Sequence, residues 1–230
     1  MKSLIKVKNL LKKYDGRTVV NEVSFDIFEN EVLGIIGPNG AGKTTIIEMI
    51  LGIRICNSGD IYYWKDNFKS EIGAQLQSVP FYPDMNVLDN LKLFSVFYGK
   101  ENSDKELIDL LNQFGLSDVI YSKANRVSGG QQKRLAIAIT ILNDPQVIFL
   151  DEPTAALDPR ARHNIRNLIL ELKEKEISVV FSSHNIEEVE RLADRIIIIN
   201  NGIIEDKGTP QDLLAKYEVE NLEKLYLKTT

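Results

Sequence analysis

The sequence predicts an α/β fold built around a mostly parallel sheet, and three observations support this prediction. Short apolar runs rich in β-branched residues are typical of buried strands, and they occur at 32–36, 146–150, 178–181 and 195–199. Segments with helical spacing of apolar residues lie between or after these runs, at 44–51, 160–175 and 185–192. Such alternation favours parallel strands with helices on both faces of the sheet. The length of 230 residues, 43% of them hydrophobic, suits one domain with a sizeable core.

Two regions depart from this pattern. Segments 5–10, 17–27 and 61–64 alternate like antiparallel strands, so we expect a small β layer that joins the main sheet. Between about residues 80 and 142 the chain is helix-rich, with helices expected at 87–98, 104–114 and 131–142. We therefore predict a single domain with three parts: a core of 1–79 and 144–209, a helical subdomain of 80–143 and a helical tail of 210–230.

Composition and charge exclude several classes of protein. The net charge of −5 argues against a general nucleic-acid binder, which normally carries a basic surface. Cys56 is the only cysteine, so no internal disulfide can form and a cytosolic protein is expected. Lysines interrupt the first apolar residues, unlike a signal peptide. Apolar runs also stay far below the ~20 residues of a membrane span, so any membrane role needs a partner.

A phosphate-binding loop is predicted between the first core strand and the helix that follows it. Gly37-Pro38-Asn39-Gly40-Ala41-Gly42-Lys43-Thr44 matches the pattern G-x-x-x-x-G-K-[ST]. Glycines let successive backbone N–H groups point at an anion, and the helix adds its positive N-terminal end. We expect Lys43 to reach the β- and γ-phosphates, the Thr44 hydroxyl to ligate Mg²⁺, and Thr45 to belong to the same binding segment. A purely structural glycine turn is disfavoured by the flanking strand and helix.

Two acids end another core strand. Asp151 and Glu152 follow Val147-Ile148-Phe149-Leu150, and the carboxyl end of a buried strand faces the crevice where α/β sheets bind ligands. Asp151 suits the Mg²⁺ shell, usually through a water molecule. Glu152 is then placed to polarise an attacking water. The alternative, a solvated acidic pair before Pro153, is weakened by the nearby phosphate loop.

A second anion site is predicted at Ser128-Gly129-Gly130-Gln131. Taken alone, Ser-Gly-Gly is more typical of a flexible linker, but here a strong helical pattern follows, so the glycines lie at a helix N-terminus. One ATP has a single set of phosphates, and the two anion sites belong to different lobes. A second copy docked head-to-tail would present its Ser128–Gly130 segment to the γ-phosphate held by the first.

With these motifs the chain resembles the ATP-binding cassette (ABC) family, specifically a transporter nucleotide-binding subunit with a RecA-like P-loop core. The resemblance covers essentially the whole chain, and the motifs come in the family's order. Residues 37–44 resemble the Walker A loop, 128–131 the signature, 147–151 the Walker B strand and 156–158 the D-loop. Two departures are Val127 for the usual leucine and Ala155 for the commoner serine.

The resemblance implies a role for each matching residue. The catalytic residues that it implies are Glu152, Lys43 and His184, the last as the switch histidine. The Mg²⁺ ligands that it implies are Thr44, Asp151 and Gln77 of the Q-loop. The implied nucleotide contacts comprise Tyr14 on the adenine, residues 37–45 and Gln77, and from the opposing chain Ser128, Gly129, Gly130, Gln131 and Asp158. Alternatives stay open: Tyr14 as a strand-edge aromatic, Gln75 in place of Gln77, and Asp158 as a plain N-cap.

The implied function is that of an ATPase whose dimer, of identical or related chains, closes on two Mg·ATP and drives a separate membrane permease. Such a subunit is cytoplasmic and peripheral on the inner face of the membrane, with no nucleic-acid partner. Two interpretations of Phe81 and Tyr82 stay open: they are exposed and accept a coupling helix of the permease, or they pack on their own helical lobe. Residues 221–228 resemble the ending of ABC-2 exporter ATPases, which favours export. The rival, a soluble ABC ATPase acting on nucleic acid or ribosomes, normally has long insertions or a second cassette.

Overall fold

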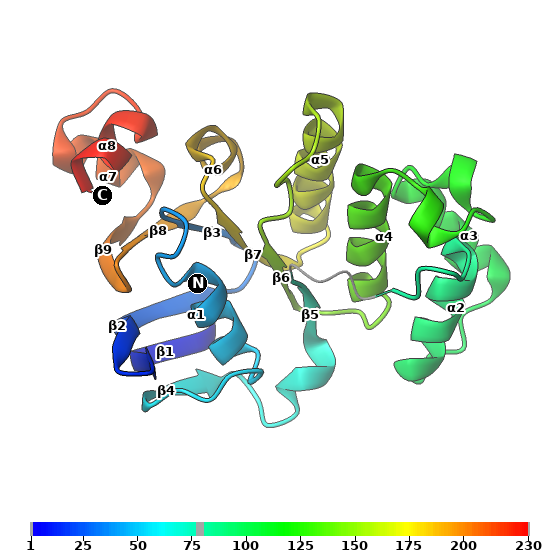
Figure 1. The fold of residues 1–230 in the computed structure, drawn as a ribbon, viewed down its shortest axis with the longest axis horizontal. Helices are drawn as coiled ribbons and strands as arrows, with labels where there is room; N and C mark the ends of the chain where they lie inside the picture. The colour runs from blue at the N-terminus through cyan, green and yellow to red at the C-terminus, as the bar shows by residue number, and fades with distance from the viewer. Residues whose placement is uncertain (1, 77–80, 230) are drawn as a thin grey trace.

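The computed structural model describes residues 2–76 and 81–229 and divides their strands between two sheets (Figure 1). The strands are β1 Ser3–Tyr14, β2 Arg17–Phe28, β3 Val32–Ile36, β4 Ser58–Tyr63, β5 Ile72–Gln75, β6 Val147–Asp151, β7 Ser178–Ser183, β8 Arg195–Asn200 and β9 Ile203–Gly208. The helices are α1 Lys43–Ile50, α2 Val87–Phe97, α3 Asp104–Gln113, α4 Gly129–Ile141, α5 Pro159–Glu174, α6 Ile186–Leu192, α7 Pro210–Tyr217 and α8 Leu222–Thr229.

The main sheet confirms the predicted fold class. Its six strands have the order β5-β6-β7-β3-β8-β9, and the first five of these are parallel. Every residue of β3, β6 and β7 is buried, which explains why each of these strands contains a continuous apolar run rather than an alternating pattern. Strand β9 pairs antiparallel with β8 and was not predicted, because only its first two residues are apolar and half of its residues are exposed.

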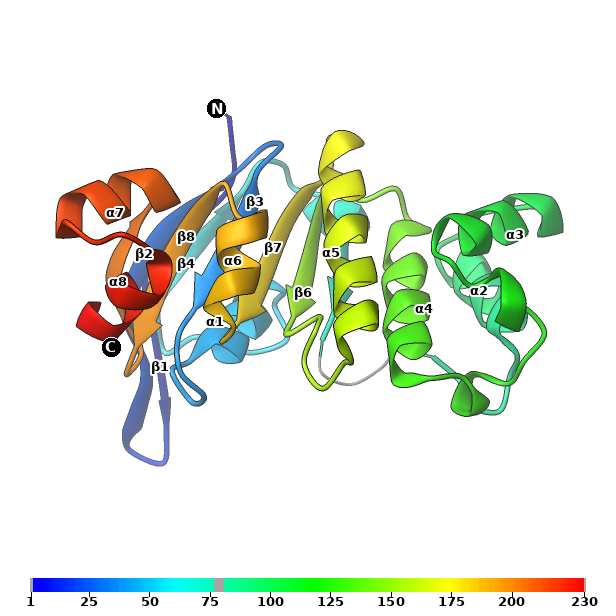
Figure 2. The ribbon, with the colours of Figure 1, turned by 90° about the horizontal axis from the view of Figure 1, so that it is seen from above.

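Alternate residues of the central strands pack into two different layers of core, because side chains of a strand point to opposite faces in turn. Leu33 and Ile35 pack with α1 and the N-terminal strands. Val32 and Ile36 pack on the other face, in the cluster that includes α5 and α6. Figures 1 and 2 show this arrangement, with α5 and α6 on one side of the sheet and α1 on the other.

The N-terminal β layer is separate from the main sheet, contrary to the prediction that it joins that sheet. Strands β2, β1 and β4 form a three-stranded antiparallel sheet of their own. Its alternating apolar residues, such as Ile5, Val7 and Phe25, give it one buried face, which packs against α1 and one face of the main sheet. An antiparallel sheet with one apolar face buries that face when it packs over another sheet, which pairing at the edge of the main sheet would not do.

The predicted helices are present, with small shifts at their ends. Helix α4 begins at Gly129 rather than Gln131, because Ser128 caps it in a capping box with Gln131. Helices α2, α3 and α4 lie together at one end of the molecule, and α7 and α8 lie at the other (Figures 1 and 2). The division at residues 80 and 143 remains a prediction. Over the described residues, no helix combines the length and apolar character that crossing a bilayer demands.

A buried ion pair joins the two sheets. Arg195 at the start of β8 donates to both carboxylate oxygens of Glu31, with Nη2–Oε1 at 2.8 Å and Nε–Oε2 at 3.0 Å. Arg195 also donates to the backbone carbonyl of Asp26 in β2. Glu31 is 2% exposed, so its charge depends on this arginine for compensation.

We expect Arg195→Met to lower the free energy of unfolding by about 3 kcal/mol, because it leaves the Glu31 carboxylate buried without a cation. Urea unfolding followed by circular dichroism measures this loss. The double variant Glu31→Gln/Arg195→Met should recover part of the stability, since it removes the unpaired charge. A loss below about 1 kcal/mol in the single variant would contradict the role given to the pair.

Candidate functional site

The glycine-rich loop leaves β3, is pressed against neighbouring backbone and enters α1. A Cβ on Gly37 would lie 2.1 Å from the carbonyl oxygen of Ile199, so only glycine fits there. Gly42 has φ +104°, and a Cβ on it would lie 2.7 Å from the carbonyl oxygen of Val19. The fixed glycines of the motif are therefore required by the close approach of β2 and β8.

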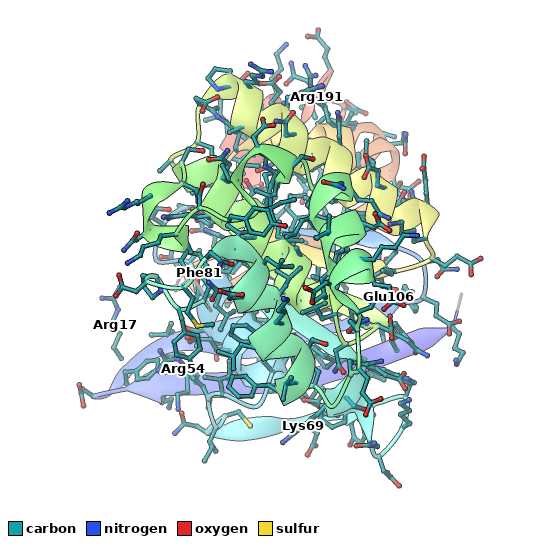
Figure 3. All side chains as sticks on the ribbon, turned by 90° about the vertical axis from the view of Figure 1, so that its right-hand side faces the viewer. Arg17, Arg54, Lys69, Phe81, Glu106 and Arg191 are labelled. Carbon is teal, nitrogen blue, oxygen red and sulfur yellow. The ribbon has the colours of Figure 1, made fainter. Side chains whose placement is uncertain are left out.

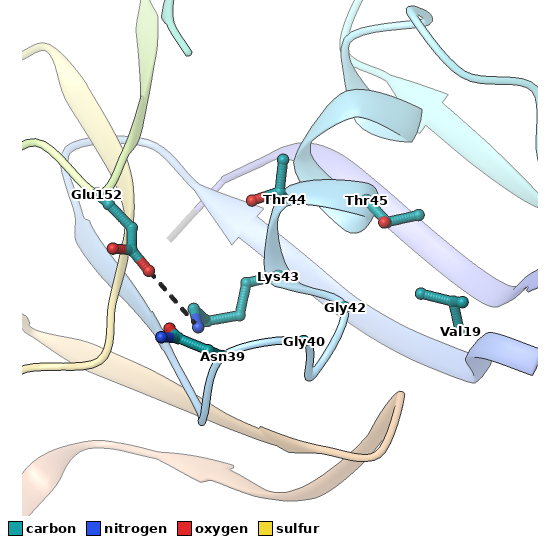
Figure 4. A pocket seen from close by; sticks show the side chains of 8 residues that line it. All are labelled: Val19, Asn39, Gly40, Gly42, Lys43, Thr44, Thr45 and Glu152. Atoms are coloured by element: carbon teal, nitrogen blue, oxygen red, sulfur yellow. Dashed lines mark ion pairs between the residues drawn. The ribbon is translucent and has the colours of Figure 1, made fainter. Parts of the chain in front are cut away.

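Lys43 points back into its own loop. Its ammonium donates to the carbonyl oxygens of Gly37 at 2.8 Å and Pro38 at 3.1 Å, and it lies 3.8 Å from Oε1 of Glu152 (Figure 4). Burial lowers the pKa of Lys43, although the carboxylates of Glu152 and Asp151 act in the opposite direction. The loop thus holds a partly desolvated cation, which is a strong point of attraction for phosphate.

A cavity of about 390 Å³ opens beside this lysine. Figure 4 shows the residues that line it, which are Val19, Asn39, Gly40, Gly42, Lys43, Thr44, Thr45 and Glu152. Seven of these were predicted as site residues, from two segments more than a hundred positions apart. Val19 was missed, because nothing in its local sequence distinguishes it from the other apolar residues of β2.

A hydrogen-bonded network connects the loop to the acidic strand end. The Thr44 hydroxyl donates to Oδ2 of Asp151 at 2.8 Å, and the Ser182 hydroxyl donates to Oδ1 of the same carboxylate. Ser182 also accepts from the backbone N–H of Glu152 at 3.0 Å. Asp151 is fully buried, so these two hydroxyls satisfy a carboxylate that water does not reach. Ser182 was missed, although a serine near the end of an apolar strand was a usable signal.

The donor chemistry of this network suits Mg²⁺. Asp151 and Thr44 offer a carboxylate and a hydroxyl, and Mg²⁺ prefers oxygen ligands, usually one or two carboxylates with substrate phosphates and water. Over residues 2–76 and 81–229, no group of three or more His, Cys, Asp and Glu side chains could hold a metal ion alone. A magnesium ion here would therefore need the nucleotide to complete its shell.

Glu152 and His184 meet at the edge of the cavity. Nδ1 of His184 lies 3.1 Å from Oε2 of Glu152, and the opposite oxygen of that carboxylate faces Lys43. A second cavity of about 180 Å³ adjoins the first through Glu152 and includes His184, Ala156 and Leu157. Asp158 accepts from the backbone N–H of Ala161 at 2.9 Å and caps α5, as in the plain N-cap alternative.

The predicted second anion site does not meet the first within one chain. Ser128 and Gly129 are exposed at the start of α4, and neither is among the described residues that line the cavity. A Cβ on Gly129 would meet no described atom within 4 Å, whereas one on Gly130 would lie 2.8 Å from Cβ of Ala161. Gly130 thus allows α4 to pack on α5, and Gly129 leaves the helix start open.

Tyr14 is not among the described residues that line the cavity. Tyr14 ends β1, and its ring contacts Lys12 and Arg54, with the cations 5.0 and 5.7 Å from the ring centroid. It is absent from the described cavity lining, so its role at an adenine stays a prediction. Gln77 falls outside the described residues. Gln75 is buried, with its Oε1 atom lacking a hydrogen-bond partner in the described part of the chain.

A phosphate-binding loop between a strand and a helix, beside an acidic strand end in a parallel sheet, defines a P-loop nucleotide-binding protein. Residues 20–155 match a family model described as ABC transporter. This match covers more than half of the chain, and the chain therefore belongs to the ABC transporter family, as an ATP-binding subunit with ATPase activity.

Relatives of known name agree with this membership. The lantibiotic transport ATP-binding protein SrtF of Streptococcus pyogenes is 35% identical over 97% of this chain and 96% of its own length. The spermidine/putrescine import ATP-binding protein PotA of Mycoplasma mycoides subsp. mycoides SC is 34% identical over 94% of this chain. The match spans 64% of PotA, so PotA has a substantial additional part.

A solved structure is similar along nearly the whole chain. The ATP-binding cassette MJ0796, described as a dimer in a post-hydrolysis state bound to ADP and Pi, superposes with a TM-score of 0.80 and 28% identity. The superposition covers 90% of this chain and 98% of that one.

We expect Lys43→Ala to lower the affinity for ATP by about tenfold or more, because it removes the buried cation of the loop. Isothermal titration calorimetry of the purified chain measures this change. Lys105→Ala, which alters an exposed lysine of α3, is the matched control and should bind ATP normally. Unchanged affinity in the Lys43 variant would count against the assignment of this cavity to phosphate.

Proposed function

We propose that two copies of the chain, or this chain and a related one, bind two ATP molecules head-to-tail. Each nucleotide then lies between the phosphate loop of one chain and the Ser128–Gly130 helix start of the other. The observation that carries this proposal is the composition of the cavity: its described lining comes from Val19, residues of the segment 39–45 and Glu152, while Ser128 and Gly129 are exposed elsewhere. The similar MJ0796 cassette is described as a dimer bound to ADP and Pi, which supports dimerisation of a nucleotide-bound cassette.

Within this site we propose that Thr44 and Asp151, with Gln77, hold Mg²⁺ beside the phosphates. When bound, the ion supplies neutralisation of the charge that develops on the transferred phosphoryl group. Lys43 contributes in the same way, because its ammonium can exchange the loop carbonyls for phosphate oxygens. Asp158 is proposed to contact the opposing site, in addition to capping α5.

Glu152 is proposed as the residue that orients and polarises the attacking water. Its carboxylate lies between Lys43 and His184, so the two neighbours fix it from opposite sides. When Lys43 turns to the γ-phosphate, the oxygen facing it becomes free to accept a proton from water. His184 then keeps the second oxygen in place and reaches toward the same phosphate.

We expect Glu152→Gln to abolish turnover while it stabilises an ATP-bound dimer, because the amide keeps the size of the side chain but cannot accept the proton. Size-exclusion chromatography with ATP measures the dimer, and phosphate release measures turnover. Glu187→Gln, which alters an exposed glutamate of α6, is the control and should hydrolyse ATP normally. A Glu152→Gln chain that stays monomeric with saturating ATP would contradict the head-to-tail mechanism.

We further propose that an aromatic surface near α2 receives a cytoplasmic helix of a membrane permease. Tyr82 is 48% exposed, and its ring lies 6.4 Å from that of Phe94, which in turn contacts Phe97 and Tyr98. Phe81 packs partly against its own helices, and Figure 3 places it beside the green helices, above Arg54. Exposed aromatic clusters of this kind are typical of protein–protein interfaces.

The direction of transport is proposed to be export, with the chain on the cytoplasmic side of the membrane. This proposal rests on the resemblance of residues 221–228 to the ending of exporter ATPases. The similar proteins include both the lantibiotic transport protein SrtF and the import protein PotA, at 35% and 34% identity. The transported substrate would be chosen by the permease, since the cavity described here suits phosphates.

We expect Tyr82→Asp to reduce co-purification with the permease about tenfold, because a charge would then lie at the centre of an aromatic contact. Quantitative pull-down of the complex from solubilised membranes measures this effect. Tyr121→Asp is the matched control, since Tyr121 is another exposed tyrosine of the helical region outside the aromatic cluster. Equal recovery of the permease with both variants would remove this surface from consideration.

A further inference from the structure

The backbone of Glu152 is held from two sides. Ser182 accepts from its backbone N–H at 3.0 Å, and the ammonium of Lys133 donates to its carbonyl oxygen at 2.8 Å. Glu152 itself has φ +49°, in the left-handed region that a residue with a side chain seldom adopts. Such a conformation persists only where surrounding groups enforce it.

Lys133 belongs to α4, five positions after Ser128, and so to the helix whose start forms the second anion site. The acidic groups that act on its ammonium are Asp151, Glu152 and Glu188, from β6, the strand end and α6. Its hydrogen bond nonetheless goes to the main chain of Glu152 rather than to a carboxylate. The contact therefore bears on backbone position more than on charge pairing.

We propose that Lys133 is a positioning residue that holds the Glu152 backbone from the signature helix of the same chain. This inference rests on the proposed function, in which Glu152 acts on the chain's own ATP while Ser128–Gly130 contacts the ATP of the partner. Lys133 then connects the two nucleotide sites of the dimer through one side chain. A displacement of α4 toward the partner's nucleotide moves the carbonyl anchor of Glu152 and aligns its carboxylate.

The first test is steady-state ATPase kinetics of Lys133→Met, which keeps most of the length of the side chain and removes the donor. We expect kcat to fall about tenfold and KM for ATP to change by less than about twofold, since the nucleotide cavity is untouched. Lys133→Arg should regain most of the rate, because a donor cation is restored. Lys123→Met is the matched control, since Lys123 is an exposed lysine just before α4, and its kinetics should remain normal.

Two outcomes of that experiment would overturn the proposal. Wild-type kcat in Lys133→Met would show that the carbonyl needs no anchor. The other outcome is that Lys133→Met and Lys133→Arg lower the melting temperature equally and also lose the same share of kcat. Lys133 would then have a merely structural role.

A second test separates the two sites with mixed dimers, isolated through two affinity tags, in which one chain carries Glu152→Gln. Lys133→Met in the chain that retains Glu152 should reduce the remaining activity about tenfold. The same substitution in the Glu152→Gln chain should leave at least about half of it. Equal loss in both arrangements would contradict a link within one chain. If Glu152→Gln forms no ATP-bound dimer, the head-to-tail function is refuted instead. The kcat measurement on Lys133→Met does not need that dimer and still tests the role of Lys133.

Discussion

The site depends on one buried carboxylate, that of Asp151. An unpaired charge at this depth would be strongly unfavourable, so its two oxygens must be satisfied from inside the fold. The hydroxyls of Thr44 and Ser182 do this, and they come from α1 and β7. Satisfying Asp151 therefore fixes the start of α1, the end of β6 and the end of β7 relative to one another. The cavity, Lys43 and Glu152 all take their positions from that arrangement.

Much of the main sheet and of the phosphate loop could be predicted from the sequence, because the patterns that indicate them are local. The loop 37–44 is defined by glycines that the close approach of Ile199 and Val19 requires, and the strands 32–36 and 147–151 are apolar because both faces are covered. The helix start after Ser128 was predicted from the helical pattern that follows it, and the structure shows it as a capping box with Gln131, while the anion site itself stays a prediction. In each case a short stretch of chain carries the recognisable pattern, although distant residues such as Ile199 supply part of its physical reason.

What could not be predicted depends on residues that meet only after folding. Ser182 contacts Asp151 across thirty-one positions, and Lys133 contacts Glu152 across nineteen. Neither sequence neighbourhood indicates its partner. Strand β9 pairs with β8 through backbone groups, and its sequence has only two apolar residues, both at its start, so hydropathy gave no signal for it. The separate N-terminal sheet was missed for a similar reason, since alternation predicts one buried face but does not say which surface covers it.

The contacts of Glu152 also bear on why a single chain would be a poor ATPase. Lys43 lies on the carbonyls of its own loop and beside Glu152, so the cation and the carboxylate partly neutralise each other. Phosphate can recruit Lys43, but the exposed start of α4 has no place in the cavity of its own chain. Charge that develops on the γ-phosphate would then be compensated from one side only. In the proposed dimer a second chain supplies this helix start, and the hydrogen bond from Lys133 connects that contact to the Glu152 backbone.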